Sequence, residues 1–279
     1  MDVSLNNQVF SPASFGELFS AWSKYPDATP FAGGTEIMRR QGRHLPHLPR
    51  NILCLDKLVD LRRITRTERY LELGAMVTLN EILRLGKAVP EVFIRCLELI
   101  AGAQVRNIAT IGGNLCYKAR RLDASAPLIG LDALYELRCA TSARWIAASR
   151  FSSLSKSLAL NEQELLTRIR IPLEPWDYSV YKKFKRQETG EFAGGAVFLV
   201  RSEKNTLTGL RVVFAGDVVL RDKNSESLLV GKRLPLDKKD AAGFAERWNA
   251  YFEGIGNQDF FFKASLLKFI TSSLDALVA

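Results

Sequence analysis

Two short segments of the chain pair adjacent glycines with hydroxyl or amide side chains, a combination suited to binding an anion. The first segment is Ala32-Gly33-Gly34-Thr35-Glu36, which follows a short predicted strand. Paired glycines let the backbone turn with positive φ and approach a ligand without a Cβ in the way, so that successive N–H groups form a concave anion site. A pyrophosphate fits such a site. A tight turn with Thr35 as a helix N-cap fits the same residues, and this segment alone favours that simpler interpretation.

The second segment, Thr110-Ile111-Gly112-Gly113-Asn114, repeats the pattern later in the chain. Neither segment matches the P-loop or the G-x-G-x-x-G pattern, so neither indicates a P-loop or Rossmann nucleotide site. Two anion-binding loops in one domain instead predict a cofactor whose diphosphate is held between them.

The composition is typical of a globular protein, since 47% of the 279 residues are hydrophobic and 25% are charged. A chain of this length is expected to form about two domains. Its apolar runs are too short to span a bilayer, which takes about 20 residues. The N-terminus lacks a basic segment followed by an apolar one, so we expect a cytoplasmic protein. The four cysteines form no C-x-x-C pair, which disfavours zinc-ribbon or ferredoxin-type ligation and predicts reduced thiols.

A net charge of +9 raises the question of nucleic-acid binding. The basic residues are spread along the chain without any known nucleic-acid motif, which favours a solvated surface or one that faces an acidic partner. His44 and His47 form an H-x-x-H pair, but Pro46 disfavours a helix there and no third ligand is evident. We therefore predict that both histidines are loop residues and that the chain holds no metal.

Hydrophobic periodicity predicts the elements that must position these loops. Helices are expected over residues 11–24, from Thr78, over 90–102 and over 127–133, and strands are expected up to Phe31 and over 51–55, 70–77, 134–139 and 164–171. Thr78 and Glu81 have the spacing of a capping box, in which each satisfies a free amide at the start of the helix.

A break at Pro172 and Pro175 predicts a domain boundary. Beyond it, residues 195–201 and 207–220 are expected to form a hairpin that turns at Glu203-Lys204-Asn205. Two helices close the chain, with apolar stripes at Phe244, Trp248 and Phe252 and at Leu266, Leu267, Ile270 and Leu274.

Several motifs resemble one known family in the same order. Ala-Gly-Gly-Thr-Glu-Ile at 32–37 resembles the first FAD loop of the molybdenum hydroxylases, which include xanthine dehydrogenase and the medium subunit of aerobic carbon monoxide dehydrogenase. The stretch IAGAQVRNIATIGGNL at 100–115 is similar to that family's second loop nearly residue by residue. LELGAMVTL at 71–79 and LLTRIRIP at 165–172 fall in family order, and YKKFKR at 181–186 with TGEFA at 189–193 looks most like the carbon monoxide dehydrogenase branch.

This resemblance implies an α+β fold. Residues 1–173 would form a PCMH-type FAD-binding domain of two subdomains, like that of vanillyl-alcohol oxidase. Residues 177–279 would form a smaller α+β domain like the C-terminal domain of the carbon monoxide dehydrogenase flavoprotein, with a three-stranded antiparallel sheet and helices. Two places depart from the family pattern: Ala119-Arg120-Arg121 replaces a usual Ser-Pro, and Gly194 stands where many members carry lysine.

The resemblance also implies that FAD is the cofactor and which residues hold it. The first loop would cradle the diphosphate, the second would complete that site, Asp123 would bind the adenosine part, and Ile100 and Leu166 would pack against the isoalloxazine ring. The implied cofactor-binding residues are Phe31, Ala32, Gly33, Gly34, Thr35, Glu36, Ile37, Ile100, Ala109, Thr110, Gly113, Asn114, Asp123 and Leu166. No residue of this chain is implied to be catalytic.

The function implied is that of an electron-transfer subunit. A molybdenum-cofactor large subunit would oxidise the substrate, an iron–sulfur small subunit would relay electrons, and the FAD of this chain would pass them to an external acceptor. The chain would be an incomplete FAD-dependent oxidoreductase with neither a nucleic-acid partner nor a membrane span, and a homodimer of the complex is compatible with this role. Two alternatives remain open, a free-standing flavin reductase and an assembly subunit that has lost FAD.

Overall fold

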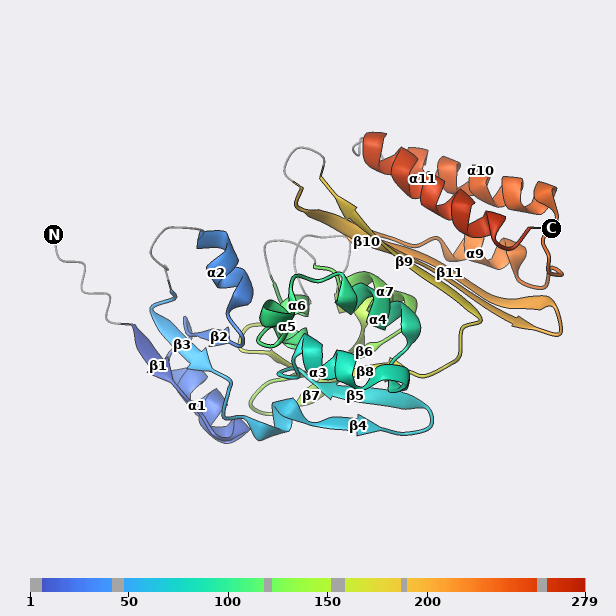
Figure 1. Cartoon of the computed structure of the whole chain (residues 1–279). Coiled ribbons are helices and arrows are strands. Elements are labelled where there is room, and N and C mark those ends of the chain that lie inside the picture. The colour runs from blue at the N-terminus through green and yellow to red at the C-terminus, as the bar shows by residue number, and fades with distance from the viewer. Residues whose placement is uncertain are drawn as a thin grey trace.

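The described part of the chain forms three β-sheets, with helices between and around them (Figure 1). The computed structural model describes residues 7–41, 48–117, 122–151, 159–186, 190–254 and 260–278. His44 and His47, and the segment at 119–121, lie outside the described residues. Within the described ranges, no helix is long and apolar enough to cross a membrane.

The N-terminal sheet is small and parallel, with its strands in the order β1 (Gln8–Phe10), β3 (Asn51–Cys54), β2 (Thr29–Phe31). Helix α1 (Phe15–Lys24) packs on it through three buried side chains, Leu18, Phe19 and Trp22. The helix begins later than residue 11 because the Ser14 hydroxyl accepts the Glu17 N–H at 3.2 Å and caps it. Strand β2 ends where the first glycine loop begins, and α2 (Thr35–Gln41) follows that loop.

The second sheet is antiparallel. Its five strands run in the order β4 (Ile64–Arg66), β5 (Tyr70–Gly74), β8 (Leu165–Pro172), β6 (Leu134–Arg138), β7 (Ala143–Ala147). Leu71 and Leu73 point to the core as the alternation in the sequence predicts, opposite Ile171 and Ile169. Strand β7 was not predicted, because its residues are mostly exposed and lack an apolar alternation.

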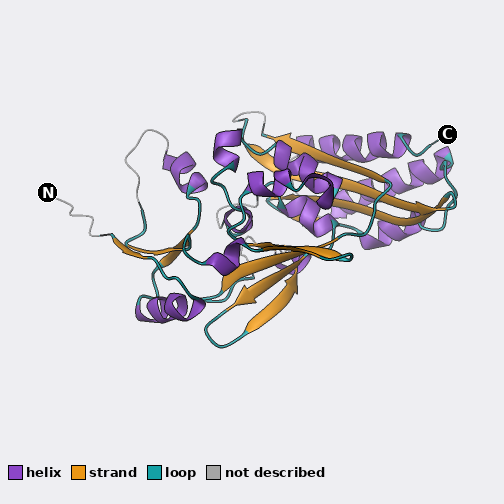
Figure 2. Cartoon of the chain, turned by 60° about the horizontal axis from the view of Figure 1, so that its bottom comes forward, coloured by secondary structure: helices purple, strands orange, loops and turns teal. Residues whose placement is uncertain are grey.

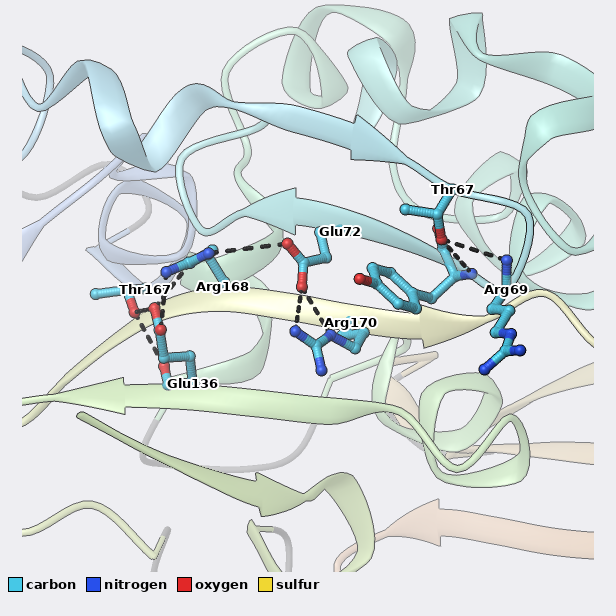
Figure 3. Close-up of polar contacts among 8 residues, drawn as sticks. Thr67, Arg69, Glu72, Glu136, Thr167, Arg168 and Arg170 are labelled. Carbon is cyan, nitrogen blue, oxygen red and sulfur yellow. Dashed lines mark hydrogen bonds and ion pairs between the residues drawn. The ribbon is translucent and has the colours of Figure 1, made fainter.

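Charged side chains alternate with these core residues and form a ladder across the same sheet (Figure 3). Glu72 on β5 pairs with Arg170 on β8 at 2.6 Å, and Arg168 on β8 pairs with Glu136 on β6 at 2.9 Å. Each pair occupies directly opposed positions, which is the geometry in which opposite charges stabilise neighbouring strands. The ladder therefore fixes the register of β8 between β5 and β6.

Short helices cover the core face of the five-stranded sheet. They are α3 (Leu79–Arg84), α4 (Glu91–Glu98), α5 (Ala103–Arg106), α6 (Ile111–Leu115) and α7 (Ser125–Gly130), with α8 (Ala148–Phe151) and the 3-10 turns η1 (Val59–Arg62) and η2 (Gly86–Ala88) at the edges. The predicted capping box is confirmed: the Thr78 hydroxyl accepts the Glu81 N–H at 3.2 Å, and the Glu81 carboxylate accepts the Thr78 N–H at 2.7 Å.

The C-terminal sheet has four antiparallel strands in the order β12 (Val219–Leu220), β11 (Thr206–Gly216), β10 (Phe192–Glu203), β9 (Tyr178–Lys185). The prediction of three strands is therefore wrong, because the sheet also contains the short edge strand β12. Its two residues are too few to be recognised as a strand in the sequence. The predicted hairpin is confirmed, and its turn residues Lys204 and Asn205 have positive φ values of 48° and 61°. Both values suit the two-residue turns that match strand twist.

Helices lie on both faces of this sheet (Figures 1 and 2). On one face Val197 and Leu199 join the same core as the central helices, and on the other Phe198 and Val200 pack under α9 (Lys223–Leu229), α10 (Lys238–Gly254) and α11 (Phe260–Asp275). Double burial explains the continuous apolar run in β10. The link between β8 and β9 spans residues 173–177, where we predict the domain boundary, and that boundary stays a prediction.

Candidate functional site

A cavity of about 1150 Å³ lies where the N-terminal sheet, the central helices and the start of β8 meet. It is larger than most small-ligand pockets, which span about 300–1,000 Å³, so its size suits a large cofactor. Every predicted cofactor-binding residue except Asp123 lines it: Phe31, Ala32, Gly33, Gly34, Thr35, Glu36, Ile37, Ile100, Ala109, Thr110, Gly113, Asn114 and Leu166.

The first glycine loop lines this cavity and has open backbone amides. Gly34 has φ +66°, a left-handed conformation that suits glycine, and it turns the chain from β2 into α2. The amides of Gly33, Gly34, Thr35 and Glu36 donate to no other described backbone or side-chain group. Unpaired amides beside a cavity are suited to bind an anion such as a diphosphate.

The two glycine loops touch each other. A Cβ built on Gly33 would lie 2.0 Å from the Ile108 carbonyl oxygen and 2.8 Å from its carbon, both far inside contact distance. Glycine is therefore required at position 33 by a backbone-to-backbone contact. This contact places the loop at 31–37 against the chain that leads into the loop at 110–114.

The second loop is used differently from the first. The Gly112 N–H donates to the Ala75 carbonyl at 2.8 Å, and the Gly113 N–H donates to the Thr110 hydroxyl at 3.1 Å, which caps α6. A Cβ on Gly112 would lie 2.7 Å from both the Cβ and the carbonyl oxygen of Ala75. Both glycine amides of this loop are thus already satisfied, so the loop forms a tightly packed wall rather than a second set of open donors. Asn114 continues this wall and accepts the Ala124 N–H at 3.3 Å.

Apolar side chains line another part of the cavity. Ile100 and Leu166 are nearly buried, with 8% and 2% of their surface exposed, and Leu79, Val105 and Leu122 also line it. An apolar wall beside open amides suits a cofactor with a flat aromatic ring at one end and an anion in the middle.

Asp123 does not line the cavity, although Leu122 beside it does. Its carboxylate pairs with the Lys183 ammonium at 2.6 Å, and its backbone carbonyl accepts the Cys96 thiol at 3.3 Å. Burial raises the pKa of that thiol well above its ordinary value, with the Asp123 charge as a second cause. The predicted contact between Asp123 and adenosine stays a prediction, and the chain just before it, at 118–121, is outside the described residues.

The sequence did not indicate the turn at 160–165, which forms another side of the cavity. Glu164 in this turn pairs with Arg144 at 2.7 Å, and this hydrogen bond lowers the pKa of the carboxyl despite its burial. The turn lies directly before Leu166, which was predicted to pack against the flavin ring. Extending the predicted site from Leu166 toward the N-terminus would therefore have included this turn.

The charge around the cavity is not supplied by free cations. Among the described lining residues Arg39 is the one cation, and it pairs with Glu36 at 2.9 Å and with Glu191 at 3.2 Å. The open amides of the first loop are therefore the donors best placed for an anion. The residues present fit FAD, because amides, a hydroxyl at Thr110 and an apolar wall surround one large cavity.

Comparison with known proteins shows the family. Residues 5–174 match the family described as the FAD binding domain in molybdopterin dehydrogenase. The chain belongs to this family. FAD is accordingly its cofactor, and it is a chain of an oxidoreductase family.

Relatives match along most of the chain. The xanthine dehydrogenase FAD-binding subunit of Escherichia coli O157:H7 is 24% identical over 82% of this chain and 81% of that protein. The carbon monoxide dehydrogenase medium chain of Hydrogenophaga pseudoflava is 26% identical over 84% of each chain.

Solved structures agree with the fold. A chain of carbon monoxide dehydrogenase from Hydrogenophaga pseudoflava, crystallised without the Mo-pyranopterin moiety, superimposes with a TM-score of 0.80 at 23% identity and covers 98% of this chain and 97% of its own. A chain of quinoline 2-oxidoreductase from Pseudomonas putida 86 gives 0.78 at 22% identity over 97% and 96%. The predicted α+β fold is confirmed by these likenesses.

One of the two departures from the family pattern has a structural explanation. Gly194 lies in β10, where an added Cβ would meet the buried Phe214 ring at 2.1 Å, so a longer side chain at this position would require that ring to move. The other departure, the segment at 119–121, is outside the described residues.

Proposed function

We propose that this chain is the flavin subunit of a multi-subunit molybdenum hydroxylase. In this role it accepts electrons from an iron–sulfur subunit and passes them through FAD to an external acceptor. The single observation that carries the proposal is the cavity that joins open loop amides to an apolar wall in a chain of this family. The relatives named above are a subunit and a medium chain, which supports a division of labour among chains.

A large relative supports the same division. Xanthine dehydrogenase 2 of Arabidopsis thaliana matches 80% of this chain, but the match covers 18% of that protein. Most of that protein therefore has no counterpart here. We propose that separate partners, a molybdenum-cofactor large subunit and an iron–sulfur small subunit, supply the corresponding functions. A cytoplasmic location belongs to this proposal, and the four free cysteines are compatible with a reducing compartment.

Within the site, each wall has a proposed role. The amides of residues 33–36 hold the diphosphate, and Thr110, Gly113 and Asn114 close the site from the facing loop. Ile100 and Leu166 exclude water from the ring and orient it. Bound FAD supplies the redox chemistry, because it can exchange electrons singly or in pairs, and the chain supplies position and electrostatics.

The first test is flavin content. The purified chain should be yellow, with FAD near-stoichiometric to protein. A colourless chain that takes up no added FAD would favour the assembly subunit without flavin and would refute the proposal.

The second test is completeness. The pure chain should be inert toward purines and aldehydes with a dye acceptor, and two further subunits should co-purify from its source. Robust substrate-dependent dye reduction by the single chain would refute the subunit role and favour a self-sufficient flavoenzyme. Stoichiometric FAD with no co-purifying subunit would likewise count against the proposal and favour a free-standing reductase.

A further inference from the structure

The turn at residues 98–101, which follows α4, is held by two cations. Nη1 of Arg106 donates to the carbonyls of Glu98, Ile100 and Ala101 at 3.3, 2.9 and 2.7 Å. The last carbonyls of a helix have no partner within the helix, and cations near them are favoured by the helix dipole. Ala101 has φ 45°, a left-handed conformation that is costly for a residue with a Cβ. The turn thus needs external bonds to keep its shape.

Lys183 supplies the fourth bond from a distant part of the chain. Its ammonium donates to the Leu99 carbonyl at 3.0 Å and pairs with the Asp123 carboxylate at 2.6 Å. Four consecutive carbonyls, from residue 98 to residue 101, therefore each accept a bond from a cation. The Lys183 and Asp123 side chains are only 18% and 8% exposed, so little water competes for these bonds.

The ammonium joins two pieces of the cavity wall. Ile100 and Ala101, within the turn, line the cavity, and so does Leu122, the neighbour of Asp123. Lys183 lies on β9 in the C-terminal sheet and does not line the cavity. Its side chain is thus a direct polar link between that sheet and the walls of the site.

We propose that Lys183 is a positioning residue for the flavin, through which the C-terminal sheet sets the shape of the cavity. The bond to Leu99 holds the wall that carries Ile100, and the ion pair with Asp123 holds the segment that carries Leu122. The inference rests on the flavin site proposed above and requires no particular electron donor or acceptor.

Lys182 provides a matched control. It is the neighbouring residue on the same strand, its side chain is exposed, and its ammonium lies over the Phe184 ring at 5.5 Å instead of reaching the cavity wall. Lys182→Met therefore removes the same charge from the same strand without touching the wall.

The test is FAD titration of Lys183→Met and Lys182→Met, together with the visible circular dichroism of the bound flavin. Loss of one charge-assisted bond predicts a dissociation constant for FAD about 10- to 100-fold larger in Lys183→Met. The flavin bands should change shape, because the ring lies against a displaced wall. Lys182→Met should match the unsubstituted chain in both measurements.

A second variant covers the case in which Lys183→Met does not fold because Asp123 is left buried without its partner. Asp123→Asn combined with Lys183→Met removes both charges; it should fold, bind FAD more weakly than Asp123→Asn alone, and show altered bands. If a folded variant lacking Lys183 binds FAD with unchanged affinity and bands, the positioning role is wrong while the flavin site stands. If the unsubstituted chain takes up no FAD, the flavin site itself fails.

Discussion

Replacing Gly33 with alanine adds one methyl group at the point where the two glycine loops touch. The new Cβ would lie 2.0 Å from the Ile108 carbonyl oxygen, whereas Cβ contacts below 3.0 Å are essentially absent from proteins. The two loops must therefore separate by about 1 Å or more. The obstructing atoms belong to the backbone, so no side-chain rotation relieves the clash.

The size of the effect follows from the donors that this shift misaligns. A hydrogen bond to a charged group contributes about 1.5–3 kcal/mol, so misalignment of two loop amides predicts a loss of about 3–6 kcal/mol of binding free energy. That loss weakens FAD binding by about 10²- to 10⁴-fold. Overpacking at the loop contact should also lower the free energy of unfolding by about 1–3 kcal/mol.

The assay is titration of the flavin-free chain with FAD, followed by quenching of flavin fluorescence. Two other glycines serve for comparison: Gly243 lies outside the site, and Gly113 lines the cavity. At Gly243 in α10 an added Cβ meets nothing within 4 Å, and at Gly113 its nearest contact is the Thr110 hydroxyl at 2.9 Å, which caps α6. We expect binding to weaken most in Gly33→Ala, slightly in Gly113→Ala and not at all in Gly243→Ala. Equal affinity of Gly33→Ala and Gly243→Ala would refute the reasoning.

Three further predictions concern stability. Thr78→Ala removes the capping box of α3 and should lower the free energy of unfolding by about 1 kcal/mol in urea, and an unchanged midpoint would contradict the cap. Glu136→Gln weakens the bonds that the carboxylate accepts from Thr167 at 2.6 Å and from Arg168 at 2.9 Å. It should lower the free energy of unfolding by about 1–3 kcal/mol, measured by chemical denaturation. A smaller loss in 1 M salt would show that salt screens this interaction. The pKa of the Glu164 carboxyl is lowered from 4.5 mainly by its hydrogen bond from Arg144. The charged carboxylate therefore stabilises the fold at pH values above the pKa of the unfolded chain. This stabilisation is lost as the pH falls through the lower pKa of the folded chain. Glu164→Gln should therefore melt below the unsubstituted chain at pH 7, with the two melting temperatures converging below about pH 4.5; a constant gap at all pH values would contradict this.

Much of the fold could be predicted from short segments of the sequence. The capping box at Thr78 and Glu81 and the turn at Lys204 and Asn205 each depend on a few adjacent residues whose conformations are limited by sterics or by a single hydrogen bond. The buried alternation of Leu71 and Leu73 was equally direct. Such features were predictable because the interactions that decide them lie within a few residues.

Features that depend on distant segments were not predictable in the same way. The edge strands β7 and β12 have little apolar pattern and form because a neighbouring strand offers free backbone groups. The ion pair of Asp123 with Lys183 joins the segment before α7 to β9, two parts of the chain that meet only in the folded protein. The family resemblance predicted a ligand contact for Asp123. The ion pair between two distant parts of the fold could not be predicted, because the spacing of residues in the sequence does not indicate it.

The two glycine pairs show why one motif can serve different physical purposes. In the first loop Gly34 is required by its positive φ and Gly33 by the close approach of Ile108, and the amides around them are unpaired. In the second loop Gly112 is required by packing against Ala75, and its amide is already bonded. A Gly-Gly pair therefore belongs to a set of backbone donors in the first loop and to a close-packed supporting wall in the second. Because the support touches the donors through Ile108 and Gly33, the anion site depends on both loops even if only one of them donates to the anion.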